Sequence, residues 1–225
     1  MPEPFHRVER RAWLCLLPLL ATALFYTLPD SLQGLTIVQL VPQLVAYVAL
    51  VVWALANGDV VRRLWLDPAG FLTGLHWGLP TGIVLGTFNV WVIRWVVPGI
   101  GGDIRFLQDT PHAQLPLAVM VPWFILCIAV FVEVNFRGFL LGRVQILLQA
   151  RGWEPSAALA ILVSALAFSF DPFMVGTFRH LHWIAVWDGM VWGVLLLRTQ
   201  SLYVPIVAHA IEVIVMYSAL KAAFA

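Results

Sequence analysis

Long apolar runs constrain this chain more than any other feature. Of its 225 residues, 61% are hydrophobic, and the mean hydropathy is +0.90. Only 11% are charged, and these lie mostly in short gaps between the apolar runs. A soluble domain of this length cannot bury so much apolar surface. We therefore predict an integral membrane protein with an all-α fold, a polytopic bundle of about seven (six to eight) transmembrane helices in one domain over residues 1–225.

Seven runs are candidates for these helices. They cover residues 12–28, 35–56, 71–97, 115 to about 137, 155–170, 181–197 and 201–224. The third is interrupted by Gly78-Leu79-Pro80, and the fourth continues as an amphipathic helix to Gln149. The fifth is short for a bilayer core. The first three runs make up an N-terminal part, residues 1–114.

Basic residues between the runs predict the orientation. With the N-terminus inside, the inner segments carry Arg7, Arg10, Arg11, Arg62, Arg63, Arg143, Arg151 and Arg198, whereas the outer ones carry Arg105, Arg179 and Lys221. Inner loops of membrane proteins are enriched in such residues, so we expect a cytoplasmic N-terminus in a bacterial inner (plasma) membrane. The lipid bilayer is the expected partner. A net charge of +1 gives no reason to expect nucleic acid.

Residues 131–143 are the most informative stretch of the chain. Glu133, Asn135 and Arg137 follow an apolar run within five residues. Glu133 and Arg137 are four apart and share a helix face, which predicts an ion pair directed into the bundle. Charges within a membrane are rare and commonly mark function, although an ordinary ion pair at a helix end would give the same pattern.

Further polar groups lie in the last three runs. Asp171 ends the fifth, Asp188 lies near the middle of the sixth, and His209 and Glu212 share a face of the seventh. A bundle must bury these groups facing inward. A carboxylate held near an imidazole in an apolar site can activate water, and Glu212 could orient His209. The alternative is a hydrogen-bonded polar cluster that only fixes helix packing.

No metal or other cofactor is expected. His180 and His182 are two apart, so they face different sides of a helix, and the neighbouring Trp183 suggests the membrane interface. No pair of residues has the spacing of a His-Glu-x-x-His helix. Cys15 and Cys127 lie in separate apolar runs and are expected to be buried small hydrophobic residues.

Two segments resemble the CPBP family, which comprises CAAX-processing and bacteriocin-processing intramembrane endopeptidases and is also called the Abi family. Residues 133–143, Glu-Val-Asn-Phe-Arg-Gly-Phe-Leu-Leu-Gly-Arg, resemble its first motif, a pair of glutamates, three residues and then Arg-Gly. A glycine-spaced helix, the turn Arg198-Thr-Gln-Ser-Leu and Pro205-Ile-Val-Ala-His209 resemble the ending of the family. The resemblance covers residues 115–220, a CPBP-like core, and implies an intramembrane endopeptidase.

Three motif positions depart from the family. Counting back from Arg137, Glu133 is the second glutamate, and Val132 stands where the family has its catalytic glutamate. In the second motif, Pro172 stands where the family has a histidine four residues after a phenylalanine. In the third, His209 is kept, but Val213 replaces the asparagine or aspartate. A shift of one residue turns a helical side chain by about 100°, so Glu133 does not automatically replace the missing glutamate.

These observations leave three readings. In the first, an endopeptidase cleaves a membrane peptide or protein: Glu133, with Asp171, activates water, His209 polarises the scissile carbonyl, and Arg137 holds Glu133. In the second, a catalytically silent relative binds a membrane peptide or protein partner in the same cavity. The third, a proton-linked transporter, fits less well because the chain lacks a repeated half. The candidate catalytic residues are Glu133, His209 and Asp171, and the supporting ones are Arg137, Asn135, Glu212 and Asp188.

We predict that the fourth and seventh runs pack side by side and bring Glu133 and His209 into one cavity, because both polar groups must be buried away from lipid. If the protein cleaves peptides, Glu133 and His209 should be indispensable for cleavage, whereas Glu212 and Asp188 should only tune it.

Overall fold

The structure is a computed structural model that describes residues 9–224, so Arg7 lies outside the described residues. Within these residues every regular element is a helix and there is no strand, which confirms the predicted all-α class. The longer helices are α1 (Leu16–Phe25), α4 (Val41–Ala56), α6 (Phe71–Trp91), α12 (Ser156–Ser169), α14 (Ile184–Thr199) and α15 (Tyr203–Phe224). The short ones are α2 (Asp30–Gln33), α3 (Thr36–Gln39), α5 (Val60–Arg63), α7 (Val97–Gly99), α8 (Pro111–Gln114) and α13 (Pro172–Phe178).

One helical segment, Leu117–Gln149, carries the residues of the first motif. It comprises α9 (Leu117–Pro122), α10 (Val130–Glu133) and α11 (Gly142–Gln149), joined by π-helical stretches at Trp123–Ala129 and Val134–Leu141. A π-helix is a rare, wider turn that is frequent at functional sites. Glu133 and Arg137 lie on either side of the start of the second stretch. We refer to the whole segment as the long helix.

In the part of the chain that the structure describes, fewer helices than the seven predicted are long and apolar enough to cross a membrane. Among the described residues, four helices are long and apolar enough to cross a membrane: Thr36–Ala56, Val60–Gly99, the long helix and Tyr203–Ala223. A fifth is possible if α12 and the segment Pro172–Leu181, which meet at a 54° bend, form one broken span. The count of about seven is not confirmed. Because a span needs about 20 residues, α1 with 10 and α14 with 16 are too short to cross alone.

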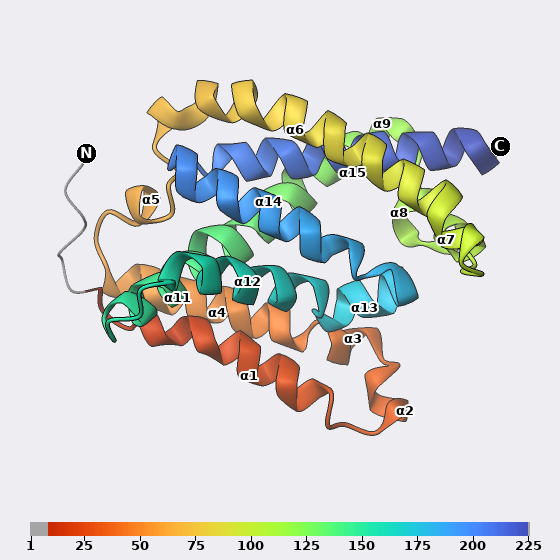
Figure 1. The fold of residues 1–225 in the computed structure, drawn as a ribbon. Helices are drawn as coiled ribbons and strands as arrows, with labels where there is room; N and C mark the ends of the chain where they lie inside the picture. Colours follow the sequence, from red (N-terminus) through yellow and green to blue (C-terminus); the bar gives the residue numbers. More distant parts are fainter. Residues whose placement is uncertain (1–8, 225) are drawn as a thin grey trace.

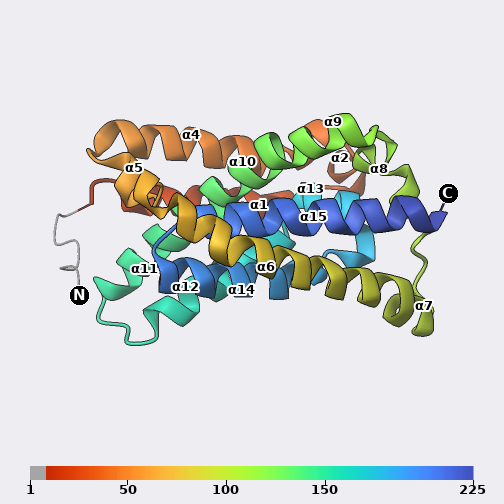
Figure 2. The same ribbon diagram turned by 90° about the horizontal axis from the view of Figure 1, so that it is seen from above.

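The helices run between two ends of an elongated bundle (Figures 1 and 2). The helices α5 and α11 lie at the end where the described chain begins, whereas α7, α13 and the C-terminus lie at the opposite end. Arg62 and Arg63 of α5 therefore share one end with Arg143 of α11. This grouping agrees with the inner set of arginines, and a cytoplasmic location for that end stays a prediction.

The closest helix pair is α6 with α15. Glycine recurs at every fourth position of α6, at Gly74, Gly78, Gly82 and Gly86, and all four are buried. A Cβ atom at Gly82 would lie 2.5 Å from the carbonyl oxygen of Ala208, so the two backbones come too close for a larger residue. The predicted interruption at Pro80 was wrong, because α6 continues through it. Close packing brings Asn89, near the end of α6, beside the site residues of α15.

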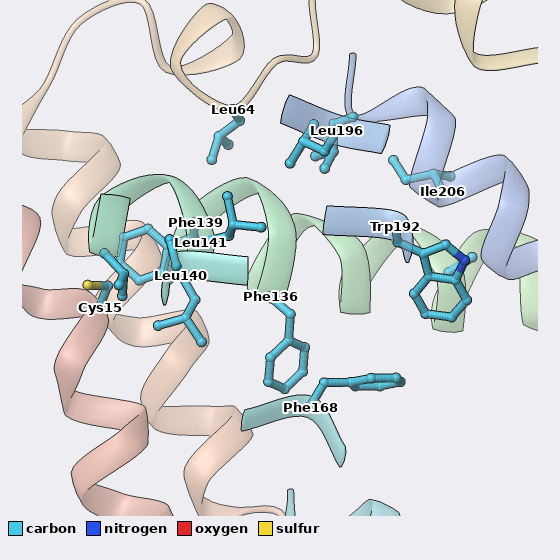
Figure 3. Packing of buried hydrophobic residues seen from close by; sticks show 14 of the residues in the cluster. Cys15, Leu64, Phe136, Phe139, Leu140, Leu141, Phe168, Trp192, Leu196 and Ile206 are labelled. Atoms are coloured by element: carbon cyan, nitrogen blue, oxygen red, sulfur yellow. The ribbon is translucent and has the colours of Figure 1, made fainter. Parts of the chain in front are cut away.

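The apolar core lies where the long helix meets α4, α12 and α14. Figure 3 shows Phe136, Phe139, Leu140 and Leu141 of the long helix in this cluster. Trp192 of α14 lies next to them, and Phe136 packs against Phe168 of α12 with ring centres 5.3 Å apart. The polar residues of the candidate site are therefore held between tightly packed aromatic side chains.

Candidate active site

Glu133 and His209 meet in the interior of the bundle. His209 Nδ1 lies 2.8 Å from Glu133 Oε1, and only 4% of His209 and none of Glu133 is exposed. Arg137 Nε lies 3.4 Å from the other oxygen, Glu133 Oε2, and Arg137 is also fully buried. The predicted Glu133–Arg137 pair and the predicted meeting of the fourth run with the seventh are therefore both confirmed.

Aromatic rings fix the orientation of His209. Its ring stacks on Trp192, with centres 4.5 Å apart and planes at 19°, and it meets Phe168 edge to face with ring centres 5.8 Å apart. A carboxylate at Nδ1 favours the form of the ring that carries a proton there, because a carboxylate can only accept. Nε2 is then the ring nitrogen that can interact with a bound group.

Arg137 occupies a slot between helices. The centre of its guanidinium lies 4.7 Å from the ring centre of Phe168 and 5.0 Å from that of Trp192. A Cβ atom at Gly189 of α14 would lie 2.6 Å from Arg137 Nη2, so the glycine provides the space for the guanidinium. Contacts with aromatic faces and the ion pair with Glu133 together offset the cost of burying this charge.

A second polar cluster lies beside the first. Asn89 Nδ2 donates to Asp188 Oδ2 at 3.0 Å and to Glu212 Oε1 at 2.8 Å. Asn89 Oδ1 accepts a hydrogen bond from Trp187 Nε1 at 3.0 Å, which fixes the orientation of the amide. This cluster links α6, α14 and α15.

A cavity of about 170 Å³ connects the two clusters. Its polar lining includes His209, Asp188 and Glu212, and the rest is mainly apolar, with Val132 and Phe168 among the lining residues. Glu133 does not line the cavity and contacts His209, which does, so the prediction that both side chains lie in one cavity was wrong for Glu133. The cavity is large enough for several water molecules or for part of a peptide.

Asp171 and Asn135 are not brought to this cavity. Asp171 Oδ1 accepts from the backbone N–H of Phe173 at 3.1 Å, which caps α13, and from Gln43 Nε2 at 2.8 Å. Asp171 and Asn135 instead line a separate small pocket. The predicted role of Glu212 in orienting His209 was wrong, because Glu133 holds His209 Nδ1 and Glu212 bonds to Asn89.

The replaced family positions differ in their surroundings. Val132 and Val213 both line the cavity, so two family positions that carry polar groups are apolar here. Pro172 begins α13 directly after the capping Asp171 and is buried. The cavity therefore keeps the histidine of the family pattern but gains its other polar groups from Asp188 and Glu212.

Sequence reasoning missed Asn89 as a site residue, although an isolated amide within an apolar run is the kind of signal that marks a buried polar group. It also missed Trp192 and Gly189, although both lie in the glycine-spaced helix that carries part of the family resemblance. Among the described residues, no group of three or more His, Cys, Asp or Glu is arranged to hold a metal ion. His182 Nδ1 instead lies 2.6 Å from the carbonyl oxygen of Arg179.

Comparison with known proteins agrees with the resemblance noted above. Residues 114–215 match the family model described as "Rce1-like: Type II CAAX prenyl endopeptidase Rce1-like". The match covers nearly the same residues as the predicted core, 115–220, and contains Glu133, Arg137, Asp188, His209 and Glu212. No curated protein and no solved structure gives a significant match to the chain.

Proposed function

We propose that this protein is a membrane-embedded endopeptidase, because residues 114–215 match the model of the Rce1-like type II CAAX prenyl endopeptidases. Its substrate is a membrane peptide or protein, and its reaction is hydrolysis of a peptide bond in the 170 Å³ cavity. One observation carries this proposal. His209, the retained family histidine, lines the cavity while its Nδ1 is held by a buried carboxylate at 2.8 Å.

His209 polarises the scissile carbonyl. When the ring is protonated, Nε2–H donates to the carbonyl oxygen, on which negative charge develops as water attacks. Glu133 stabilises that protonated ring through Nδ1 and prevents it from rotating, and Trp192 stacks against it. A preformed donor of this kind typically contributes about 10²–10³-fold to the rate.

Glu133 acts through His209. Its two carboxylate oxygens face His209 Nδ1 and Arg137 Nε, and its side chain has no exposed surface. Glu133 does not line the cavity, so a water molecule bound there contacts His209 rather than Glu133. We therefore propose that Glu133 is a positioning residue, with Arg137 holding it as an ionised carboxylate, whereas His209 touches the substrate.

The second candidate function is that of a catalytically silent relative that binds a membrane peptide or protein. Val132 and Val213 support it, because they make apolar the cavity positions at which the family has polar groups. The same cavity would then hold an apolar segment without cleaving it. The two functions differ in whether a bound peptide is hydrolysed.

A cleavage assay distinguishes them. The purified full chain in proteoliposomes is offered a panel of peptides, including prenylated peptides with a CAAX ending and unprenylated membrane-spanning peptides. We expect the wild type to cleave at least one peptide and His209→Ala to lose at least about 10²-fold in turnover. Glu133→Gln should lose a comparable factor, whereas Glu154→Gln, at an exposed position, should match the wild type.

The outcomes have separate meanings. If both site variants cleave as fast as the wild type, the proposed site is wrong. If the wild type binds a peptide but cleaves none of the panel, the protein is a silent relative, and Val132→Glu with Pro172→His then asks whether activity can be restored. The reaction proposed here uses no metal, so metal analysis that finds a tightly bound zinc ion in active protein would contradict it.

A further inference from the structure

The proposed reaction needs a group that takes a proton from water, and the structure shows a candidate that is absent from the motif pattern. Asp188 of α14 and Glu212 of α15 line the cavity with His209, and they are 3% and 4% exposed. They come from different helices and meet at one point. We call them the carboxyl pair.

The side-chain amide of Asn89 binds one oxygen of each carboxyl group in the pair. Asn89 Nδ2 donates to Asp188 Oδ2 and to Glu212 Oε1, at 3.0 and 2.8 Å. The remaining oxygens, Asp188 Oδ1 and Glu212 Oε2, are buried and receive no hydrogen bond from another residue of the described chain. Buried carboxylate oxygens without a donor are costly, so these two atoms mark a position prepared for a bound molecule.

Both carboxyl groups of the pair accept from the same nitrogen, Asn89 Nδ2, so they lie close together. Two carboxylates this close in an apolar site repel each other, which favours a state in which the pair holds one proton. With one proton on the pair, a protonated His209 makes the buried set neutral, because Glu133 and one carboxylate of the pair then balance Arg137 and His209.

Resting on the proposed endopeptidase function, we propose that the carboxyl pair is the catalytic acid–base unit of this protein. The ionised carboxylate takes a proton from the attacking water while the water oxygen bonds to the scissile carbonyl carbon. The protonated carboxyl donates its proton to the carbonyl oxygen, and His209 Nε2–H donates a hydrogen bond to the same oxygen. The product of this step is a neutral tetrahedral diol.

The second step returns the pair to its starting state. The carboxyl group that gained the water proton gives it to the amide nitrogen, and the carbon–nitrogen bond breaks to release an amine. The diol then loses one hydroxyl proton to the other carboxylate as the new carboxylic acid forms. The pair holds one proton before and after the cycle, so protons and electrons balance. Two carboxyl groups that share one proton are known to support acid and base roles at one site.

The first test compares near-isosteric variants, Asp188→Asn and Glu212→Gln, with the wild type and with Glu154→Gln on a peptide that the wild type cleaves. We expect kcat to fall about 10²–10⁴-fold in both variants with KM unchanged. A pair that only joins α14 to α15 would instead leave kcat unchanged. Thermal unfolding in detergent shows whether each variant is folded.

The second test needs no variant, so it decides the question if the variants do not fold. A peptide in which the scissile bond is replaced by hydroxyethylene, –CH(OH)–CH₂–, places one hydroxyl where the diol would form. We expect it to inhibit the wild type at least about 10²-fold more strongly than the same peptide with –CH₂–CH₂–, because it resembles the tetrahedral state. Equal inhibition by the two peptides would overturn the proposal.

The possible failures are distinguishable. If the wild type cleaves the peptide and folded Asp188→Asn and Glu212→Gln cleave it equally well, the carboxyl pair is not the acid–base unit and the proposed function stands. If the wild type cleaves nothing, both proposals are overturned. If only one of the two variants loses activity, the pair does not act as a unit, and the proposal is wrong in this form.

Discussion

Arg137 and Arg143, six positions apart on the long helix, have similar surroundings. Each is buried, each faces a carboxylate and each lies over an aromatic ring. Arg143 Nε lies 3.1 Å from Glu9 Oε1, and its guanidinium is 4.4 Å from the ring centre of Trp53. Arg137 has Glu133 at 3.4 Å and two rings, Phe168 and Trp192.

The difference lies in their other contacts. Arg143 donates to the backbone oxygens of Gly138 and Arg63, at 3.0 and 2.9 Å, and so ties the N-terminal segment and the α5 region to the long helix. Arg137 donates no hydrogen bond of good geometry within the described chain, and its charge acts on Glu133, Asp188 and Glu212. A buried arginine that bonds to backbone oxygens of other segments holds those segments together. One surrounded by aromatic rings and carboxyl groups instead sets the electrostatics of a cavity.

The largest effect is expected for Arg137→Leu. The change leaves Glu133 as a buried carboxylate without its cation, which costs about 3–5 kcal/mol in the free energy of unfolding. Turnover should fall at least about 10²-fold, because Glu133, which orients His209, loses the cation that holds it. Arg137→Lys keeps the charge but not the planar stacking, and should lose less. Denaturant unfolding in detergent measures the loss of stability, and the cleavage assay measures turnover. A stable and active Arg137→Leu protein would show that Arg137 does not act on the site, and would contradict the distinction drawn between Arg137 and Arg143.

Next comes Gly189→Ala, which disturbs Arg137 without touching its charge. The new Cβ atom would lie 2.6 Å from Arg137 Nη2 and 3.0 Å from the Cα atom of Ala165, so the guanidinium must move. We expect a loss of about 1–3 kcal/mol from overpacking and a decrease of about 10- to 10²-fold in turnover, because small displacements in a site are costly. Gly193→Ala, whose Cβ would meet only apolar side chains at 3.1–3.2 Å, is the matched control. Equal turnover of the two alanine variants would contradict the proposed role of Arg137.

Arg143→Met tests the other half of the comparison. It removes the ion pair with Glu9 and two hydrogen bonds to backbone oxygens, so the free energy of unfolding should fall by about 1–3 kcal/mol. Turnover of the folded fraction should stay at the wild-type value, since none of these contacts lies at the cavity. A double-mutant cycle with Glu9→Gln isolates the contribution of the ion pair. If Arg143→Met abolishes cleavage while remaining folded, the distinction between Arg143, which joins segments, and Arg137, which acts on the site, is wrong.

The sequence was sufficient for the helical class, for the Glu133–Arg137 pair and for its contact with His209. These follow from apolar runs, a spacing of four residues and a family motif, all of which are local patterns. The number of spans could not be predicted from the sequence, because hydropathy does not show where a chain bends or where a helix ends. The helices α12 and α13 meet at a bend beside Asp171, and α14 is too short to cross a membrane alone.

The carboxyl pair could not be assembled from sequence. Asp188 and Glu212 lie on different helices, and Asn89, which holds both, is 99 and 123 positions away from them. The contact of Asn89 with Glu212 depends on the close approach of α6 to α15, which rests on buried glycines. Asp171 illustrates the opposite error. A carboxylate beside a motif position suggested catalysis, whereas the structure uses it to cap α13 and to bind Gln43.

The smallest effect is therefore expected for Asp171→Asn. Asparagine caps a helix about as well as aspartate, and its side-chain oxygen can still accept from Gln43 Nε2, so the free energy of unfolding should change by less than about 1 kcal/mol. Turnover should equal that of the wild type, because Asp171 lines a different pocket from His209. Asp171→Ala, which removes the cap, should cost about 0.5–2 kcal/mol and still leave the folded protein active. A loss of turnover in Asp171→Asn of the size expected for Asp188→Asn, with unchanged unfolding, would return Asp171 to the catalytic set and extend the site beyond the cavity around Arg137.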